Sequence, residues 1–194
     1  MKTLYLERST GECRKGDWVE KLDLEGVGRI VVGTGPGSFA GIRSALAFAQ
    51  GYALGRPGME VLGLPSACAI AATFLSQSQP RPSTSTSLAV IGDARQGKLW
   101  IAEFDGYNLV KEIYQIESSA LQLQLHPSTV VASPDDKRIG SLLKDTFGDR
   151  YLGERLPTAE GLKVFAEVNP AILVKEPLPI YLNPAVRSRY EQVS

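Results

Sequence analysis

Histidine and cysteine are scarce in this chain of 194 residues, which has one histidine, His126, and two cysteines, Cys13 and Cys68. No CxxC, HExxH or HxxxH pair occurs, so a zinc site built from these ligands is not expected. His126 stands beside a proline, and no G-x-S-x-G motif supports a catalytic triad, so we expect an ordinary loop residue. We assign no metal ligand and no catalytic residue, and expect both cysteines to be free thiols.

Net charge is also lacking, because 21 Lys and Arg residues balance 21 Asp and Glu residues. A protein that neutralises many phosphates by itself carries a basic excess, so strong direct binding of nucleic acid is not expected. No apolar run approaches the roughly 18–20 residues that span a bilayer. Residues 1–16 are apolar first and charged later, the wrong order for a signal peptide. We therefore expect a cytoplasmic protein with no membrane contact.

The composition is that of a globular protein, with 43% hydrophobic and 22% charged residues. This length allows one domain or two small lobes. Residues 76–87, SQSQPRPSTSTS, have no apolar side chain except proline and predict a linker or exposed loop. We expect an N-terminal lobe over 1–86, a C-terminal lobe over 87–170, and a tail over 171–194 that returns toward the first lobe.

Hydrophobic patterning predicts a mixture of strands and helices in both halves. The first half is expected to contain strands over 4–6, 29–32 and 61–64, a weak strand within 13–25, and helices over 39–54 and 67–75, the last with Ser66 as N-cap. The second half is expected to contain an antiparallel meander over 88–91, 98–104 and 109–116, a strand over 129–132, and helices over 137–147 and 159–168. The fold class is therefore α/β.

A glycine-rich loop, GTGPGSFAG at 33–41, joins an expected strand to an expected helix. Glycine lets the backbone approach another group closely, and Ser38 can cap the helix, whose free N–H groups attract anions. The loop is neither a P-loop nor a G-x-G-x-x-G motif, since the required Lys and third Gly are absent. Two interpretations stay open: a phosphate cradle, or a tight turn with a serine cap.

The helix expected over 39–54 has few polar residues, namely Arg43, Ser44 and Gln50. A stripe of small residues recurs every four positions, at Gly41, Ala45, Ala49 and Ala53. A helix that is apolar nearly all round is buried on both sides. Either a partner protein or the second lobe covers it. The candidate interface residues are Phe39, Ile42, Ala45, Leu46, Ala49, Tyr52 and Ala53.

Two charged positions have a structural and a functional interpretation. Asp93 and Arg95 either face a cleft between the lobes or shape a hairpin turn with Gly97. Arg43 either approaches an anion at the helix N-terminus or pairs with an acid of the other lobe. The candidate residues for an anion or nucleotide are Gly35, Gly37, Ser38, Arg43 and Asp93.

Four motifs in order resemble the TsaB family, also called YeaZ. They are GPGSFAGIR at 35–43, GLPS at 63–66, DARQGKLW at 93–100 and PIYL at 179–182. The resemblance covers about 150 residues and implies a two-lobed fold of the actin, sugar-kinase and Hsp70 type. It implies a role in making threonylcarbamoyladenosine at position 37 of tRNA, as a non-catalytic, glycoprotease-like (peptidase M22-like) subunit. The implied partners are TsaD-like and TsaE-like proteins, with ATP or ADP as the candidate cofactor at a subunit interface.

The first residues depart from the family pattern. Where the family has an Ile-Asp-Thr-Ser turn, this chain reads LERST at 6–10, without the aspartate. The glycine loop also arrives earlier than in the family, so we expect a truncated N-terminal lobe. The family's first helix would then be shortened or absent. Its loss would expose more of the helix over 39–54 and favour a homodimer when the chain is alone.

Two other functions stay open beside the non-catalytic subunit. One is a nucleotide-dependent transferase that uses the loop at 33–41, although no acid cluster is present to hold magnesium. The other is a diverged relative that associates with itself outside the pathway.

Overall fold

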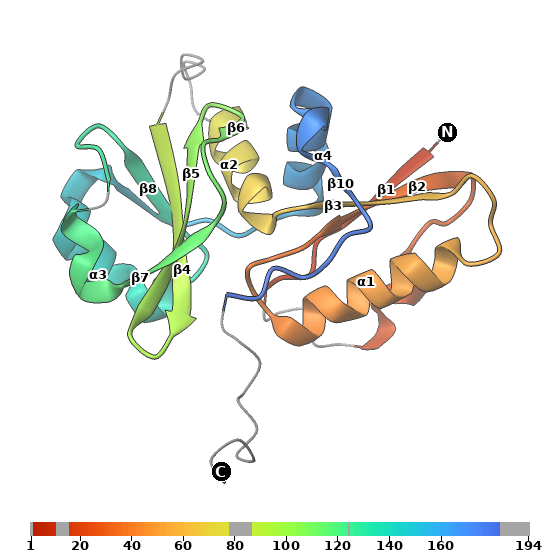
Figure 1. Ribbon diagram of the computed structural model, residues 1–194, viewed down its shortest axis with the longest axis horizontal. Helices are drawn as coiled ribbons and strands as arrows, with labels where there is room; N and C mark the ends of the chain where they lie inside the picture. Colours follow the sequence, from red (N-terminus) through yellow and green to blue (C-terminus); the bar gives the residue numbers. More distant parts are fainter. Residues whose placement is uncertain (1, 11–15, 78–86, 124, 183–194) are drawn as a thin grey trace, which may run out of the picture.

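Two β-sheets lie on either side of a pair of helices (Figure 1). The computed structural model describes residues 2–10, 16–77, 87–123 and 125–182. Cys13, most of the expected linker and the last residues of the chain lie outside the described residues.

The first sheet has the strand order β1-β2-β3-β10. These strands are β1 (Lys2–Leu6), β2 (Val27–Gly33), β3 (Glu60–Leu64) and β10 (Val174–Lys175). β1, β2 and β3 are parallel, whereas β10 runs antiparallel to β3. The β-branched run Ile30, Val31 and Val32 is buried on both faces of the sheet, as is typical of a parallel strand.

The second sheet has the order β6-β5-β4-β8-β9, and β7 also pairs with β5. These strands are β4 (Ser87–Arg95), β5 (Lys98–Asp105), β6 (Asn108–Leu109), β7 (Tyr114–Glu117), β8 (Val130–Ser133) and β9 (Tyr151–Glu154). The expected meander is confirmed, with its third strand broken into β6 and β7. β8 is parallel to β4 and to β9.

The α-helices form three layers around these sheets (Figure 1). They are α1 (Phe39–Ala53), α2 (Ser66–Gln77), α3 (Asp136–Phe147) and α4 (Ala159–Val168). Short 3-10 helices cover Gly16–Lys21, Ser118–Leu123, Gly148–Arg150 and Pro170–Ile172. α1 packs on the outer face of the first sheet, α3 packs on the outer face of the second, and α2 and α4 lie between the sheets.

Alternation along the strands assigns side chains to these layers. Ile30 and Val32 face α1, whereas Val31 faces the central helices. In the second sheet, Val90 faces the central helices and Ile91 faces α3. Each sheet therefore contributes one face to a common central core. Neighbouring residues of a strand point to opposite faces, which explains why Val31 and Val90 belong to this core while Ile30 and Ile91 do not.

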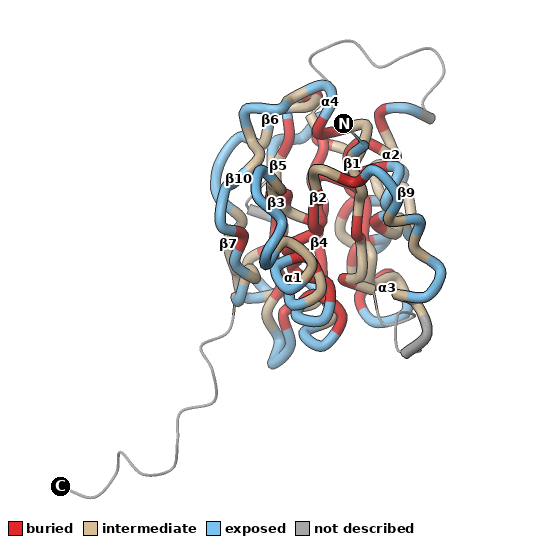
Figure 2. Tube along the Cα trace, turned by 90° about the vertical axis from the view of Figure 1, so that its right-hand side faces the viewer, coloured by how far each residue is buried: buried red, intermediate tan, exposed pale blue. Residues whose placement is uncertain are grey.

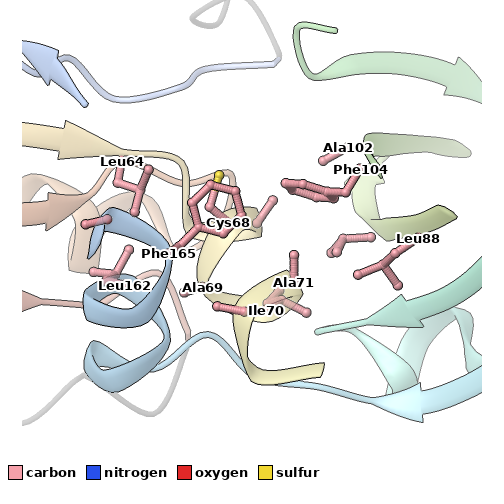
Figure 3. Close-up of a cluster of buried hydrophobic side chains, with 14 of the residues drawn as sticks. Leu64, Cys68, Ala69, Ile70, Ala71, Leu88, Ala102, Phe104, Leu162 and Phe165 are labelled. Carbon is pink, nitrogen blue, oxygen red and sulfur yellow. The ribbon is translucent and has the colours of Figure 1, made fainter. Parts of the chain in front are cut away.

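The central core includes the contact between α2 and α4 (Figure 3). A Cβ on Gly161 would come closer than 3.0 Å to Ala69 O, so glycine lets the two helices approach closely. Phe165 of α4 is fully buried and meets Phe104 of β5 edge-on, with 6.0 Å between ring centroids. The division of the chain at 86/87 stays a prediction.

Two expectations about local structure are wrong. Residues Gly16–Lys21 form a 3-10 helix instead of part of a weak strand, and Trp18 packs on Phe48 at 5.3 Å between ring centroids. Ser66 does not cap α2 from outside but is its first residue, and its hydroxyl accepts the N–H of Gly35.

The described part of the chain contains no helix whose length and apolar character would let it cross a membrane.

Candidate functional site

The glycine loop at 33–41 leaves β2 and enters α1, and residues 7–9, which follow β1, lie directly on it. A Cβ on Gly33 would come closer than 3.0 Å to the Glu7 carboxyl, on Gly37 to Ser9, and on Gly41 to the Arg8 carbonyl. Three glycines spaced by four residues therefore admit three consecutive residues of the same chain. Close approach of the chain itself, by backbone at Gly37 and Gly41 and by the Glu7 side chain at Gly33, accounts for these glycines.

Several N–H groups of this loop already donate within the chain. Thr34 N donates to Leu64 O at 2.9 Å, and Gly35 N donates to Ser66 Oγ at 3.0 Å. Ser38 N donates to Ser9 O at 2.5 Å. Ser38 Oγ accepts the Gly41 N–H at 3.4 Å and so caps α1, as expected of a tight turn with a serine cap.

The C-terminal segment lies against the same loop. Ile180 N donates to Thr34 O at 2.9 Å, and the ring of Tyr181 lies 5.4 Å from that of Phe39. In Figure 1, this segment crosses between β3 and α1 toward the end of the described chain. The loop is thus packed against residues 7–9 on one side and against Ile180 and Tyr181 on the other. Residues 7–9 fill the space over this loop, and four of its N–H groups already donate within the chain, so the loop does not fit a bound ATP or ADP in this arrangement.

Glu7 is the residue of this region that sequence reasoning missed. Its Oε1 accepts the N–H of Ser9 at 2.7 Å, while its enclosed Oε2 has no hydrogen-bond partner among the described residues. Burial raises the pKa of Glu7, and its hydrogen bonds with Ser9 offset part of that effect. One signal was available: Glu7 follows an apolar strand at the place where the resembling family carries its aspartate.

Arg43 and Asp93 do not join the three loop residues that were predicted with them. Arg43 is exposed on α1, with its guanidinium 4.9 Å from the centre of the Phe39 ring. Asp93 belongs to β4 in the other sheet, where its Oδ2 lies 3.0 Å from Arg138 Nε. The five predicted anion-binding residues therefore do not form one site in this structure.

Asp93 and Arg95 have the geometry of the structural interpretation. The Arg95 N–H donates to Asp93 Oδ1 at 2.8 Å. Arg95, Gln96 and Gly97 have φ values of 70°, 54° and 76°, which lie in the left-handed region. This local hydrogen bond and the succession of positive φ values shape the turn between β4 and β5.

The expected interface residues of α1 lie mostly on its inner side. Ile42, Ala45, Leu46 and Ala49 are buried against the first sheet, so these four side chains do not face outward. Phe39 is exposed, and Tyr52 and Ala53 are partly buried. Within this chain one side of α1 faces solvent, so the second lobe does not cover it, and cover by a partner protein stays a prediction (Figure 2). The helix buried on both sides is α2.

The outward side of α1, named here the α1 face, consists mostly of small side chains and carries a single charge, that of Arg43. Its exposed residues are Ala40, Arg43, Ser44, Ala47, Gln50, Gly51 and Leu54. Large apolar side chains are exposed at both of its ends: Phe39 (57%) and its neighbour Tyr181 (53%) at the N-terminal end, and Leu54 (78%) at the C-terminal end. An open groove of about 590 Å³ lies at its C-terminal end, where Leu54, Met59 and Val61 line it together with Pro177.

The described residues of this region assemble neither a metal site nor a reactive thiol. Within the described ranges, no three side chains of His, Cys, Asp or Glu gather as a metal site requires. Cys68 lies buried in α2 as a free cysteine, and burial raises the pKa of its thiol. A buried thiol of this kind is unreactive.

Comparison with known proteins places this geometry in a family. The family model for TsaD, described as tRNA N6-adenosine threonylcarbamoyltransferase, matches residues 19–124. A structure from Pseudomonas aeruginosa, described as an uncharacterized protein with similarity to peptidase YeaZ, is 20% identical to this chain with a TM-score of 0.70. The match covers 93% of this chain and 99% of that one.

A second structure, YeaZ from Pseudomonas aeruginosa, is also 20% identical, with a TM-score of 0.69 over 92% of this chain and 99% of that one. No curated protein matches this chain significantly. These likenesses confirm the expected fold class, an α/β fold of the actin, sugar-kinase and Hsp70 type.

Proposed function

Because the chain belongs to the TsaD family of tRNA N6-adenosine threonylcarbamoyltransferase proteins, we propose that it is a non-catalytic subunit for this tRNA modification. Its role is to bind a TsaD-like enzyme, which carries out the transfer. The proposal also includes a TsaE-like protein as a further partner in the same assembly, and a homodimer when the chain is alone.

The packing of the glycine loop is the observation that carries the non-catalytic part of this proposal. A nucleotide-dependent transferase would use the loop at 33–41 to hold phosphate. Here the carboxyl of Glu7 and the backbone of Ser9 lie on the loop, and the N–H of Ser38 donates to Ser9 O. The carboxyl of Glu7 therefore fills space that a phosphate would need at this loop.

The α1 face supports the binding part of the proposal. Large exposed apolar side chains that lie together mark interaction surfaces. Phe39, Tyr181 and Arg43 belong to the residue types, aromatic and arginine, that are enriched at protein interfaces. The small side chains between them, such as Ala47 and Gly51, would let a partner helix approach closely.

Binding to a TsaD-like protein from the same cell tests this role. We expect Ala47→Arg, which places a long charged side chain at the middle of the α1 face, to weaken the affinity for the partner at least tenfold. Ser141→Arg adds the same side chain at an exposed position of α3 and is the matched control, which should leave the affinity unchanged. Isothermal titration calorimetry measures both. Equal binding by the two variants contradicts the use of the α1 face.

Nucleotide binding separates this role from the transferase. We expect the purified chain to show no heat of binding with ATP or ADP and no hydrolysis of ATP. Measurable affinity for ATP that drops on Gly37→Val would instead support a transferase that uses the glycine loop. Sedimentation with and without the TsaD-like protein distinguishes a pathway subunit from a chain that only associates with itself.

A further inference from the structure

The Glu7 carboxyl is enclosed where β1, β2 and α2 meet, and it lies close to Gly33 and to the Ser66 hydroxyl. One of its oxygens accepts a hydrogen bond from Ser9 N, and the other accepts none within the described part of the chain. A buried carboxylate needs a counter-charge or several donors to stay ionised at low cost. Hydrogen bonding with Ser9, Ser66 and the Arg8 backbone offsets only part of the cost of burying the Glu7 carboxyl.

Charged groups on the neighbouring elements are engaged elsewhere. Arg29 of β2 donates to Glu60 of β3 at 2.8 Å. Lys2 of β1 pairs with Asp23 at 2.5 Å. The guanidinium of Arg8, on the same segment as Glu7, lies 4.3 Å from the centre of the Trp18 ring.

The remaining neighbouring elements add no ion pair to Glu7 among the described residues. The charge on α1 is that of Arg43, which lies over Phe39. α2 has the sequence SACAIAATFLSQ, whose one titratable group is the buried thiol of Cys68. Residues 177–182 carry no charged side chain, and the hydroxyl of Tyr5 is neutral below its raised pKa.

We propose that residues 7–9 are a proton-dependent latch on the glycine loop. With the Glu7 carboxyl protonated, the latch lies on Gly33, Gly37 and Gly41. With the carboxyl ionised, the latch leaves the loop and carries the charge into water. Only a proton moves in this step, from the carboxyl to solvent, while the two sheets stay folded.

The direction of the pH effect follows from the geometry. Burial raises the pKa of Glu7 in the closed latch, whereas the released carboxyl has an ordinary value. The closed latch therefore binds its proton more tightly than the released one. Its stability is complete below the ordinary pKa of a glutamate and is lost as the pH rises through the raised pKa.

Release of the latch would affect the start of α1. Ser9 O accepts the N–H of Ser38, the N-cap of the helix, and the Arg8 carbonyl lies against Gly41 in its first turn. An open latch leaves the Ser38 N–H to solvent. This inference does not depend on the proposed function, since each of its tests uses the isolated chain.

Amide hydrogen exchange of the full chain tests the latch. After correction for the intrinsic pH dependence of exchange, we expect protection of the Ser38 amide to fall as the pH rises from the ordinary glutamate range. The protection factor of the Ser38 amide should fall about tenfold for each pH unit between the pKa of Glu7 in the released latch and its pKa in the closed latch. Amides paired between β4 and β5 are the internal reference and should not change. In Glu7→Gln, protection of the Ser38 amide should be independent of pH.

Two further variants keep the test decisive. Glu103→Gln removes a carboxyl that is bound by Tyr114 and Lys111 in the other sheet, and it should retain the pH dependence of the wild type. Gly33→Ala places a Cβ where the Glu7 carboxyl lies, so protection of the Ser38 amide should be lost even at acid pH while the reference amides stay protected. The proposal is overturned if the wild type shows no pH dependence at Ser38, if Glu7→Gln retains it, or if Gly33→Ala leaves Ser38 protected.

Discussion

Two glycines of α1 show how surroundings decide what a residue does. Gly41 faces inward, and a Cβ there would come closer than 3.0 Å to the Arg8 carbonyl. Gly51 faces outward on the α1 face, and a Cβ there would have no neighbour within 4 Å. Neither has a positive φ. Gly41 is therefore needed by the fold of this chain, whereas nothing in the fold of this chain accounts for Gly51.

Alanine substitution at these two positions should change stability in opposite directions. We expect Gly51→Ala to raise the free energy of unfolding by about 0.5–1 kcal/mol, because alanine loses less backbone entropy in a helix. Gly41→Ala should lower it by about 1–3 kcal/mol, because the added methyl group meets backbone that must move. Urea unfolding of the two variants measures both effects. A loss of stability in Gly51→Ala would show that the outward side of α1 is already packed.

Phe165 and Val168 make a similar pair at the scale of an element, since both belong to α4. Phe165 is fully buried between α2 and the second sheet, whereas Val168 is 57% exposed. We expect Phe165→Ala to lower the free energy of unfolding by about 3–5 kcal/mol. Val168→Ala should change it by less than about 0.5 kcal/mol. Thermal and urea unfolding give both values, and similar losses would contradict the central position of α4.

The elements themselves could largely be predicted from the sequence, because local patterns determine them. The β-branched residues at 30–32 indicate β2, and Ser38 together with the apolar run after it indicates α1. The inward side of α1 can be predicted as well, although small residues occur on both sides, at 41, 45, 49 and 53 and at 40, 44, 47 and 51. Ile42 and Leu46 lie beside the first stripe, whereas the polar residues Arg43, Ser44 and Gln50 lie beside the second. Helical periodicity therefore favours the first stripe as the buried side, and its assignment to a partner surface is wrong.

The candidate site was harder to predict, because distant segments form it. The loop was visible as a run of glycines, but nothing local shows that Glu7, Arg8 and Ser9 fill the space above them. A single acidic residue after a strand forms no repeating pattern, so periodicity does not indicate that Glu7 is buried. The contact of Tyr181 with Phe39 likewise joins residues far apart in the chain. Glycines at these positions would serve equally to admit another segment of the chain or a ligand. The sequence alone therefore supports both interpretations.

At the scale of the whole molecule, the central core ties the two sheets together. Leu64 from the first sheet and Phe104 from the second belong to one cluster with α2 and α4 (Figure 3). Each sheet also has a separate cluster on its outer face, under α1 or α3. The shared cluster is completely enclosed at its centre, so neither sheet can lose its partner without exposing apolar surface to water.

The two tryptophans make this coupling measurable, because Trp18 packs against the outer cluster under α1, whereas Trp100 of the second sheet belongs to the shared core. Trp18 packs on Phe48 of α1, beside the first sheet, and Trp100 is buried in β5 of the second. In Trp100→Phe the fluorescence reports on the first sheet, and in Trp18→Phe it reports on the second. Because both sheets bury the same central helices, we expect the urea midpoint from fluorescence to equal that from far-UV circular dichroism within each variant. Adding Phe165→Ala should lower both fluorescence midpoints together. Two separate midpoints, or a shift confined to one tryptophan, would mean that the sheets unfold as independent lobes.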